Sequence, residues 1–229
     1  MNFDSSRTER VLGAEAVRKL ADAHVAVFGA GGVGGFVCEA LVRAGVGRLT
    51  VIDGDVIDSS NINRQIIALA DNVGRPKTEA MKQRILSINP ECDVIAKQLF
   101  FLPENSSEID FSGFDAVADC VDTVAAKVEI ARLCTISGTA VISSMGAGNK
   151  LHPERFRISD IFKTEVDPLA KAMRVRLRNA GIKHLPCVWS DEIPAVKSVP
   201  PGSLSFVPSA AGLIMAGWIV RKLTGTEGL

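Results

Sequence analysis

The sequence lacks several patterns that would place it in other classes of protein. Its five cysteines are scattered with no CxxC pair, and its three histidines show no metal-ligand spacing. This argues for reduced thiols, and against a disulfide framework or a structural zinc site. The 26 basic residues equal the 26 acidic residues in number. Any basic surface for nucleic acid must therefore be local.

Long apolar runs are also scarce. The longest spans residues 210–220 and contains two glycines. It is too short to cross a bilayer, so we expect it to form part of a buried helix. The polar beginning MNFDSSRTER shows no secretory signal. We therefore predict a cytoplasmic protein without membrane attachment.

The chain instead alternates apolar strands with helices. Strands are predicted at 24–29, 48–53, 92–96, 114–120 and 139–144, and helices at 32–44, 76–89 and 123–137. Strands that are apolar on both faces indicate a mostly parallel sheet with helices on each side. The less regular last third predicts short strands at 155–160 and 187–190 and helices at 168–180 and 210–223.

The predicted fold class is α/β, with a doubly wound, mostly parallel Rossmann-like sheet and a short antiparallel carboxyl-terminal elaboration. Neither an internal repeat nor a low-complexity linker divides the 229 residues. We predict one domain over residues 1–229, in which residues 150–229 form the substrate side.

A glycine loop follows the first predicted strand and opens the next helix. Its GxGxxG pattern runs from Gly29 to Gly34. Gly29 permits the tight turn, Gly31 lets phosphates approach the backbone, and Gly34 lets the helix pack on the strand. Asp53, at the end of the second predicted strand, is placed to accept hydrogen bonds from ribose hydroxyls. No GK[ST] follows, which excludes a P-loop, and NAD is the default nucleotide for this pattern.

A polar run after Asp53 has no use in hydride transfer. It contains Asp55, Asn61, Arg64 and Gln65, and Lys77 follows at the start of a predicted helix. Further along, Asp119 and Asp122 stand at the end of another strand, on the same edge of the sheet. Cations offset charge on phosphoryl oxygens, and a carboxylate can hold magnesium. The combination predicts chemistry at a phosphate.

The sequence resembles the ubiquitin-activating-enzyme superfamily of adenylating enzymes through GAGGVG, DGD, SNINRQ, VGRPK and DCVDT, which occur in that order. The resemblance implies that ATP and Mg²⁺ are bound and that a substrate carboxylate is adenylated. It implies that Asn61, Arg64 and Lys77 contact the triphosphate and that Asp122 holds Mg²⁺. It also implies a homodimer in which Arg7, with Arg10 as the rival, reaches the partner subunit's site. The nucleotide-binding residues predicted in this way are Gly29, Gly31, Gly32, Gly34, Asp53, Asp55, Asn61 and Gln65.

The later region resembles one branch of that superfamily, the bacterial tRNA threonylcarbamoyladenosine dehydratases. MGAGNKLHP, ISDIFKTEVDPLAKAMRVRLR and CVWSDE carry this resemblance. It implies that tRNA is the substrate, with the modified adenosine beside the anticodon as the reacting nucleotide. Residues 168–190 contain no acidic residue, and Lys171, Arg174 and Arg178 would share one helix face suited to an RNA backbone. A solvated helix face is the alternative.

Other interpretations stay open from the sequence. The adenylated substrate could be the carboxyl-terminal Gly-Gly of a small sulfur-carrier protein, or the protein could be an NAD-dependent oxidoreductase. Cys187 could be a thiol that accepts sulfur from a sulfur-transfer partner, or a small buried apolar residue. The MGAG segment at 145–148 is expected to line the cleft, and the sequence offers no test of a monovalent cation there.

Overall fold

The computed structural model describes residues 3–196 and 198–226, and a single seven-stranded sheet runs through them in the order β3-β2-β1-β4-β5-β7-β6. The edge strand β6 is antiparallel to β7, and all other neighbouring strands are parallel. The predicted fold class is confirmed, including the antiparallel elaboration. The strands are β1 His24–Phe28, β2 Arg48–Ile52, β3 Asp93–Lys97, β4 Ala116–Asp119, β5 Ala140–Ser144, β6 Phe156–Asp160 and β7 Pro186–Ser190.

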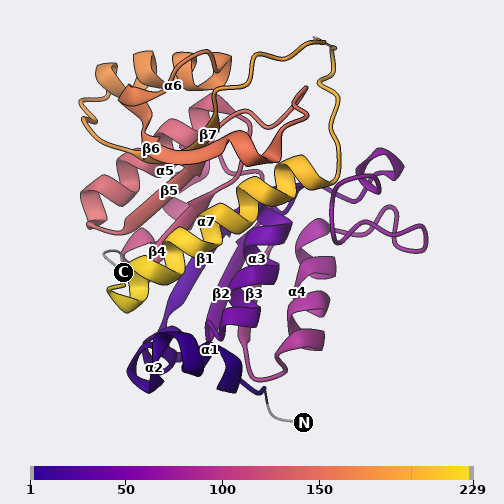
Figure 1. Ribbon diagram of the computed structural model, residues 1–229, viewed down its shortest axis with the longest axis vertical. Helices are drawn as coiled ribbons and strands as arrows, with labels where there is room; N and C mark the ends of the chain where they lie inside the picture. Colours follow the sequence, from indigo (N-terminus) through magenta and orange to yellow (C-terminus); the bar gives the residue numbers. More distant parts are fainter. Residues whose placement is uncertain (1–2, 197, 227–229) are drawn as a thin grey trace.

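Helices cover both faces of the sheet (Figure 1). On one face, α3 (Gly34–Ala44), α4 (Lys77–Ile88) and α7 (Phe206–Thr224) enclose the largest apolar core. On the other, α5 (Val124–Ser137) encloses a second core with Phe28, and α6 (Pro168–Asn179) a third with β7. This two-sided cover explains why the central strands are almost continuously apolar.

Two helices before β1 were not predicted. They are α1 (Ser6–Leu12) and α2 (Ala14–Asp22). No residue of α1 is buried, and α2 buries only Ala16 and Leu20. The absence of burial explains why α1 leaves no apolar pattern, but the apolar residues of α2 do follow helical spacing, so that helix was predictable and was missed.

The last helix, α7, is longer than predicted because it begins at Phe206 rather than at residue 210. Pro208 lies in its first turn, where backbone amides have no partner within the helix, so proline does not break it there. With 19 residues and a mean hydropathy of 1.3, α7 is long and apolar enough to cross a membrane. The core helix of a globular protein passes the same test, and Val207, Ala211 and Met215 are fully buried in the main core.

The sheet reverses its strand order between β1 and β4. The chain moves from β1 outward to β2 and β3, then returns to place β4 on the other side of β1. In doubly wound sheets this switch point leaves a crevice beyond the carboxyl ends of the strands, where ligands bind.

Candidate functional site

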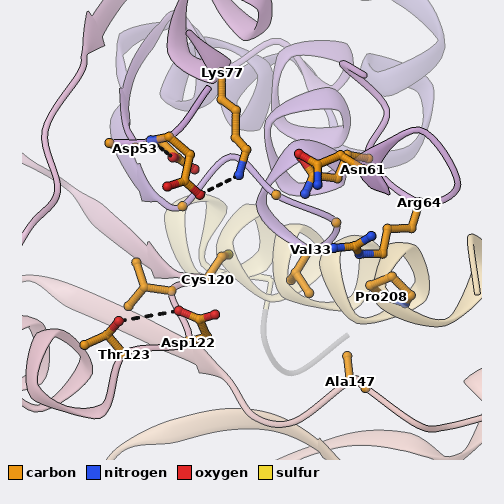
Figure 2. Close-up of a pocket in the computed structure, with 18 of the residues that line it drawn as sticks. Val33, Asp53, Asn61, Arg64, Lys77, Cys120, Asp122, Thr123, Ala147 and Pro208 are labelled. Atoms are coloured by element: carbon orange, nitrogen blue, oxygen red, sulfur yellow. Dashed lines mark hydrogen bonds and ion pairs between the residues drawn. The ribbon is translucent and has the colours of Figure 1, made fainter. Parts of the chain in front are cut away.

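A cavity of about 510 Å³ occupies this crevice. Its walls come from the loops after β1, β2, β3 and β4, from the polar run after Asp53, and from the segment before α7. Ten of the predicted site residues line it: Gly29, Gly31, Gly32, Asp53, Asp55, Asn61, Arg64, Gln65, Lys77 and Asp122. Lys77, Asn61 and Arg64 lie across the cavity from Asp122 and Thr123 (Figure 2).

The glycine loop is shaped by two close approaches. Gly29 has a φ of +87°, and a Cβ there would lie 2.9 Å from the carbonyl oxygen of Cys120. A Cβ on Gly34 would lie 1.7 Å from the carbonyl oxygen of Gly29. Gly34 does not line the cavity itself; it lets α3 start directly against the loop. Gly31 has more room, since its nearest neighbour, Nε2 of Gln65, would be 3.7 Å from a Cβ.

Asp53 connects the glycine loop to the loop after β2. Its Oδ2 accepts a hydrogen bond from the amide of Ala30 at 2.7 Å, and its Oδ1 accepts one from the amide of Asp55 at 2.8 Å. Burial raises the pKa of the Asp53 carboxyl, and these hydrogen bonds and the charge of Lys77 oppose that rise. The carboxylate keeps lone pairs for a ligand hydroxyl.

Lys77 meets Asp55 because the polar run folds back on itself. The amide of Lys77 donates to the carbonyl of Asp55 at 3.1 Å, and Val56 and Pro76 form an antiparallel bridge. The Lys77 ammonium is 2.7 Å from Oδ2 of Asp55 and only 8% of the side chain is exposed. A buried ammonium with one carboxylate partner retains donors for a further anion.

The rest of the polar run presents donors to the cavity. Asn61 ends a short 3₁₀ turn, Ser59–Asn61, and its Oδ1 accepts from the amide of Asp58 at 3.1 Å. The guanidinium of Arg64 points toward Val33 (Figure 2) and donates to the carbonyl of Ser60 at 2.8 Å. Gln65 is buried, and its Oε1 has no hydrogen-bond partner among the described residues.

Asp122 is exposed on the opposite wall. Its Oδ1 accepts from the hydroxyl of Thr123 at 3.5 Å. The described residues contain no group of three or more His, Cys, Asp or Glu that could hold a metal. Magnesium needs no such group, because it is commonly held by one or two carboxylates together with substrate phosphates and water. The carboxylate of Asp122, across the cavity from Lys77 (Figure 2), fits that pattern.

Asp119 was predicted to share the sheet edge with Asp122, but it does not line the cavity. Its side chain is buried beneath the β4 loop, and its Oδ2 is 2.9 Å from Nζ of Lys127. Asp119 therefore forms a buried ion pair beneath the loop and does not face a ligand. The burial of Lys127 was not predicted, because a lysine in a helix is usually exposed to solvent.

Arg7 and Arg10 are exposed on α1 and lie outside this cavity. Because α1 precedes β1, it sits at the amino-terminal edge of the sheet, opposite the cavity (Figure 1). A Cβ on Gly45, just after α3, would lie 3.6 Å from the ring of Phe3, which places this segment beside the far end of α3. Neither arginine reaches the cavity of its own chain.

The basic face of α6 is partly used within the chain. Arg174 donates to the carbonyl of Thr164 at 3.0 Å, and the guanidinium of Arg178 lies 5.2 Å from the centroid of the Phe162 ring. Lys171, Arg176 and Arg178 are exposed. The surface is therefore basic, with Arg174 serving mainly to hold the adjacent loop.

Sequence reasoning also missed the apolar wall and the loop at the cavity mouth. Leu99, Phe100 and Phe101 follow β3 and line the cavity. A Cβ on Gly54 would lie 2.8 Å from Phe100, so this glycine admits the β3 loop. The Pro200–Ser203 segment also lines the cavity, and only a packed structure reveals that this loop returns to the nucleotide edge.

Cys187 has the environment of a core residue. It is fully buried in β7, and burial raises the pKa of its thiol to about 12. Cys120 does line the cavity, but burial raises the pKa of that thiol well above its ordinary value too. Neither is an activated thiolate.

The fold and cavity together define a nucleotide-binding α/β protein whose glycine loop shares its cavity with the cationic side chains of Arg64 and Lys77. Residues 5–229 match the ThiF family. The chain belongs to the ThiF family.

Two curated relatives and two solved structures are similar over most of the chain. The tRNA threonylcarbamoyladenosine dehydratase of Bacillus subtilis is 44% identical, over 95% of this chain and 93% of the relative. The Escherichia coli protein of the same name is 39% identical, over 81% of this chain and 72% of the relative. Crystal structures of the Escherichia coli enzyme with AMP and with ATP superpose with TM-scores of 0.92 and 0.91 at 35% identity. They cover 96% and 97% of this chain, and 93% and 94% of theirs.

Proposed function

We propose that this chain is an ATP-dependent tRNA threonylcarbamoyladenosine dehydratase. The observation that carries the proposal is the cavity itself, where a glycine loop faces Lys77, Arg64 and Asp122. Similarity to dehydratases over nearly the whole chain, and to structures holding ATP and AMP, supports it. An NAD-dependent oxidoreductase would leave these charged groups without a role.

The reaction has two bond-forming steps. A threonyl carboxylate oxygen attacks the α-phosphorus of ATP, and pyrophosphate leaves. The carbamoyl nitrogen of the same nucleotide then attacks the acyl carbon, its proton passes to solvent, and AMP departs with the carboxylate oxygen. The net result is a ring and the loss of the elements of water. Because both reacting groups belong to one nucleotide, orientation replaces a catalytic cysteine.

The cavity residues divide into binding and charge stabilisation. Asp53 accepts hydrogen bonds from the ribose hydroxyls, and Leu99 to Phe101 pack against the base. Asn61, Arg64 and Lys77 hold the triphosphate and stabilise charge on the departing pyrophosphate. Asp122 would hold Mg²⁺, which supplies Lewis-acid stabilisation to the phosphate oxygens when bound.

The remaining assignments extend the same proposal. The chain acts as a homodimer in which Arg7, or Arg10, reaches the partner subunit's cavity from α1. The α6 surface with Lys171, Arg176 and Arg178 contacts the tRNA backbone. Residues 1–229 form one domain, with 150–229 on the substrate side, and the enzyme works in the cytoplasm without membrane attachment.

The test is AMP release from ATP and magnesium by the purified protein. Threonylcarbamoylated tRNA, unmodified tRNA and a carrier protein ending in Gly-Gly are supplied separately. AMP formed with the modified tRNA alone supports the proposal. AMP formed only with the carrier would assign the chain to carrier activation, and no AMP with any substrate would overturn adenylation.

Two variants link that activity to the cavity. Lys77→Met and Arg64→Ala should each lower the rate of AMP release by about a hundredfold or more. Lys82→Met, also on α4 but away from the cavity, is the matched control and should retain the wild-type rate. Equal losses in all three variants would point to general damage to α4 and its loop.

A further inference from the structure

Lys127 is a fully buried lysine close to the cavity, but it does not line it. It lies in the second turn of α5, and its side chain has no exposed surface. Burying an ammonium is costly unless it is paired and hydrogen-bonded. Its ammonium is 2.9 Å from Oδ2 of Asp119 and donates to the carbonyl of Val121 at 3.0 Å.

The carboxylate of Asp119 extends the network to a second strand. Asp119 is the last residue of β4 and is in register with Ser143 of β5. The Ser143 hydroxyl donates to Oδ2 of Asp119 at 2.5 Å, and the amide of Val121 donates to Oδ1 at 3.4 Å. Two strand ends, the loop after β4 and the first turns of α5 are thus tied to one buried ion pair.

The tied segment forms the wall that carries the predicted magnesium ligand. Cys120, Val121, Asp122 and Thr123 all line the cavity. Thr123 stands at the N-cap of α5 but makes no side-chain capping hydrogen bond. Apart from the 3.5 Å contact of the Thr123 hydroxyl with Asp122 and the 4.0 Å contact of Cys120 with Met215, the side-chain hydrogen bonds described for this turn come from Lys127 and Asp119. The same loop backs onto the glycine loop, since a Cβ on Gly29 would meet the Cys120 carbonyl.

We infer that Lys127 is a positioning residue for the nucleotide. By holding the Val121 carbonyl and the Asp119 carboxylate, it fixes the loop so that Asp122 faces the magnesium-bound triphosphate. The inference rests on the proposed function to the extent that Asp122 is the magnesium ligand. A buried ion pair is weak evidence for stability, because apolar residues of similar volume often replace one at little cost. Its role here is to set the position of the loop.

The test measures ATP binding by calorimetry without tRNA, with magnesium and again with EDTA. Removing one partner alone leaves an uncompensated buried charge, so the central variant is the double substitution Lys127→Met with Asp119→Asn. Lys127→Arg keeps a cation, Asp122→Asn removes the proposed ligand, and Arg132→Met alters a partly exposed ion pair with Glu129 on the same helix. Thermal midpoints are recorded for all of them.

The double variant should fold, bind ATP in EDTA about as wild type does, and lose about tenfold or more of the affinity that magnesium adds. Asp122→Asn should show the same split, Lys127→Arg should restore part of the magnesium effect, and Arg132→Met should match wild type. Wild-type magnesium dependence in the double variant would overturn the inference. So would equal losses with and without magnesium, or no magnesium effect in wild type. Failure of the proposed function appears separately, as absent AMP release by wild type with modified tRNA.

Discussion

Asn149 and Gly202 are joined by two hydrogen bonds beside the cavity, which Gly202 lines. The Asn149 amide donates to the Gly202 carbonyl at 2.8 Å, and the Gly202 amide donates to Oδ1 of Asn149 at 2.7 Å. The hydroxyl of Ser198 donates to the same Oδ1 at 2.8 Å. On the other side, Nδ2 of Asn63 donates to the carbonyl of Ser203 at 3.0 Å. The loop over residues 198–203, part of which lines the cavity, is therefore held at both ends by asparagine side chains.

Asn149→Ala should loosen this loop. The substitution removes the side-chain acceptor and places alanine at a φ of +58°, which asparagine tolerates better. We expect a local loss of about 1–3 kcal/mol, measured as faster amide exchange at residues 198–203. Asn149→Asp keeps an acceptor oxygen and should show a smaller change. Unchanged amide exchange at residues 198–203 in Asn149→Ala would show that Asn149 does not hold this loop in place.

The two glycines Gly34 and Gly31 should respond differently to alanine. In Gly34→Ala the new Cβ would lie 1.7 Å from the Gly29 carbonyl oxygen. Relieving this clash requires the backbone of the loop or of α3 to move, which is costly. We expect a loss of about 3 kcal/mol or more in unfolding free energy, measured by denaturant titration. In Gly31→Ala the methyl fits, with its nearest neighbour at 3.7 Å. That variant should fold normally but bind ATP more weakly, because the methyl group blocks close approach of the phosphates.

Gly113→Ala is the control for both variants. No atom lies within 4 Å of a Cβ built there, and Gly113 is outside the cavity. It should match wild type in stability and in ATP affinity. A stable Gly34→Ala, or a Gly31→Ala with wild-type affinity, would show that the glycine loop yields more easily than its contacts indicate.

The sequence predicted the sheet and the residues at its carboxyl edge better than it predicted their pairings. Alternating apolar strands set the fold, and the ends of parallel strands meet at one edge, so Asp53, Lys77 and Asp122 could be placed together. The pairing of Asp119 with Lys127 could not be predicted, because it depends on packing between β4 and α5. The hydrogen bond from Arg174 to Thr164 could not be predicted either, because it depends on how the loop before α6 packs against that helix. Helix α1 escaped prediction because none of its residues is buried, whereas the amphipathic pattern of α2 was present in the sequence and was missed.

Asp53 and Asp58 should titrate on opposite sides of the ordinary aspartate pKa. Burial raises the pKa of Asp53 above 3.8, whereas hydrogen bonds from Ser60 lower the pKa of the exposed Asp58 below it. Because the folded-state pKa of Asp53 is raised, its ionised form costs stability at neutral pH. That cost disappears as pH falls through the raised pKa. Because the folded-state pKa of Asp58 is lowered, its ionised form stabilises the folded protein at neutral pH. That stabilisation is lost as pH falls through the lowered pKa.

Carboxyl-carbon chemical shifts followed by NMR from pH 2 to 7, roughly the range that spans aspartate titration, measure both groups directly. Asp53→Asn identifies the first resonance and Asp58→Asn the second. ATP affinity should also weaken as Asp53 becomes protonated, since the neutral carboxyl is a poorer acceptor for ribose hydroxyls. A midpoint for Asp53 at or below that of Asp58 would contradict the burial argument.

Cys187 should behave as a core residue and not as a sulfur acceptor. It lies in β7, its side chain is fully buried in the core that α6 covers, and its thiol pKa is raised to about 12, so almost no thiolate exists at neutral pH. Iodoacetamide should label Cys187 only after unfolding, as followed by peptide mass spectrometry. Cys187→Ala should lower the unfolding free energy by about 1 kcal/mol through the small cavity it leaves. It should release AMP at the wild-type rate. Rapid labelling of the native protein, or loss of AMP release in a folded Cys187→Ala, would instead assign this thiol to the chemistry.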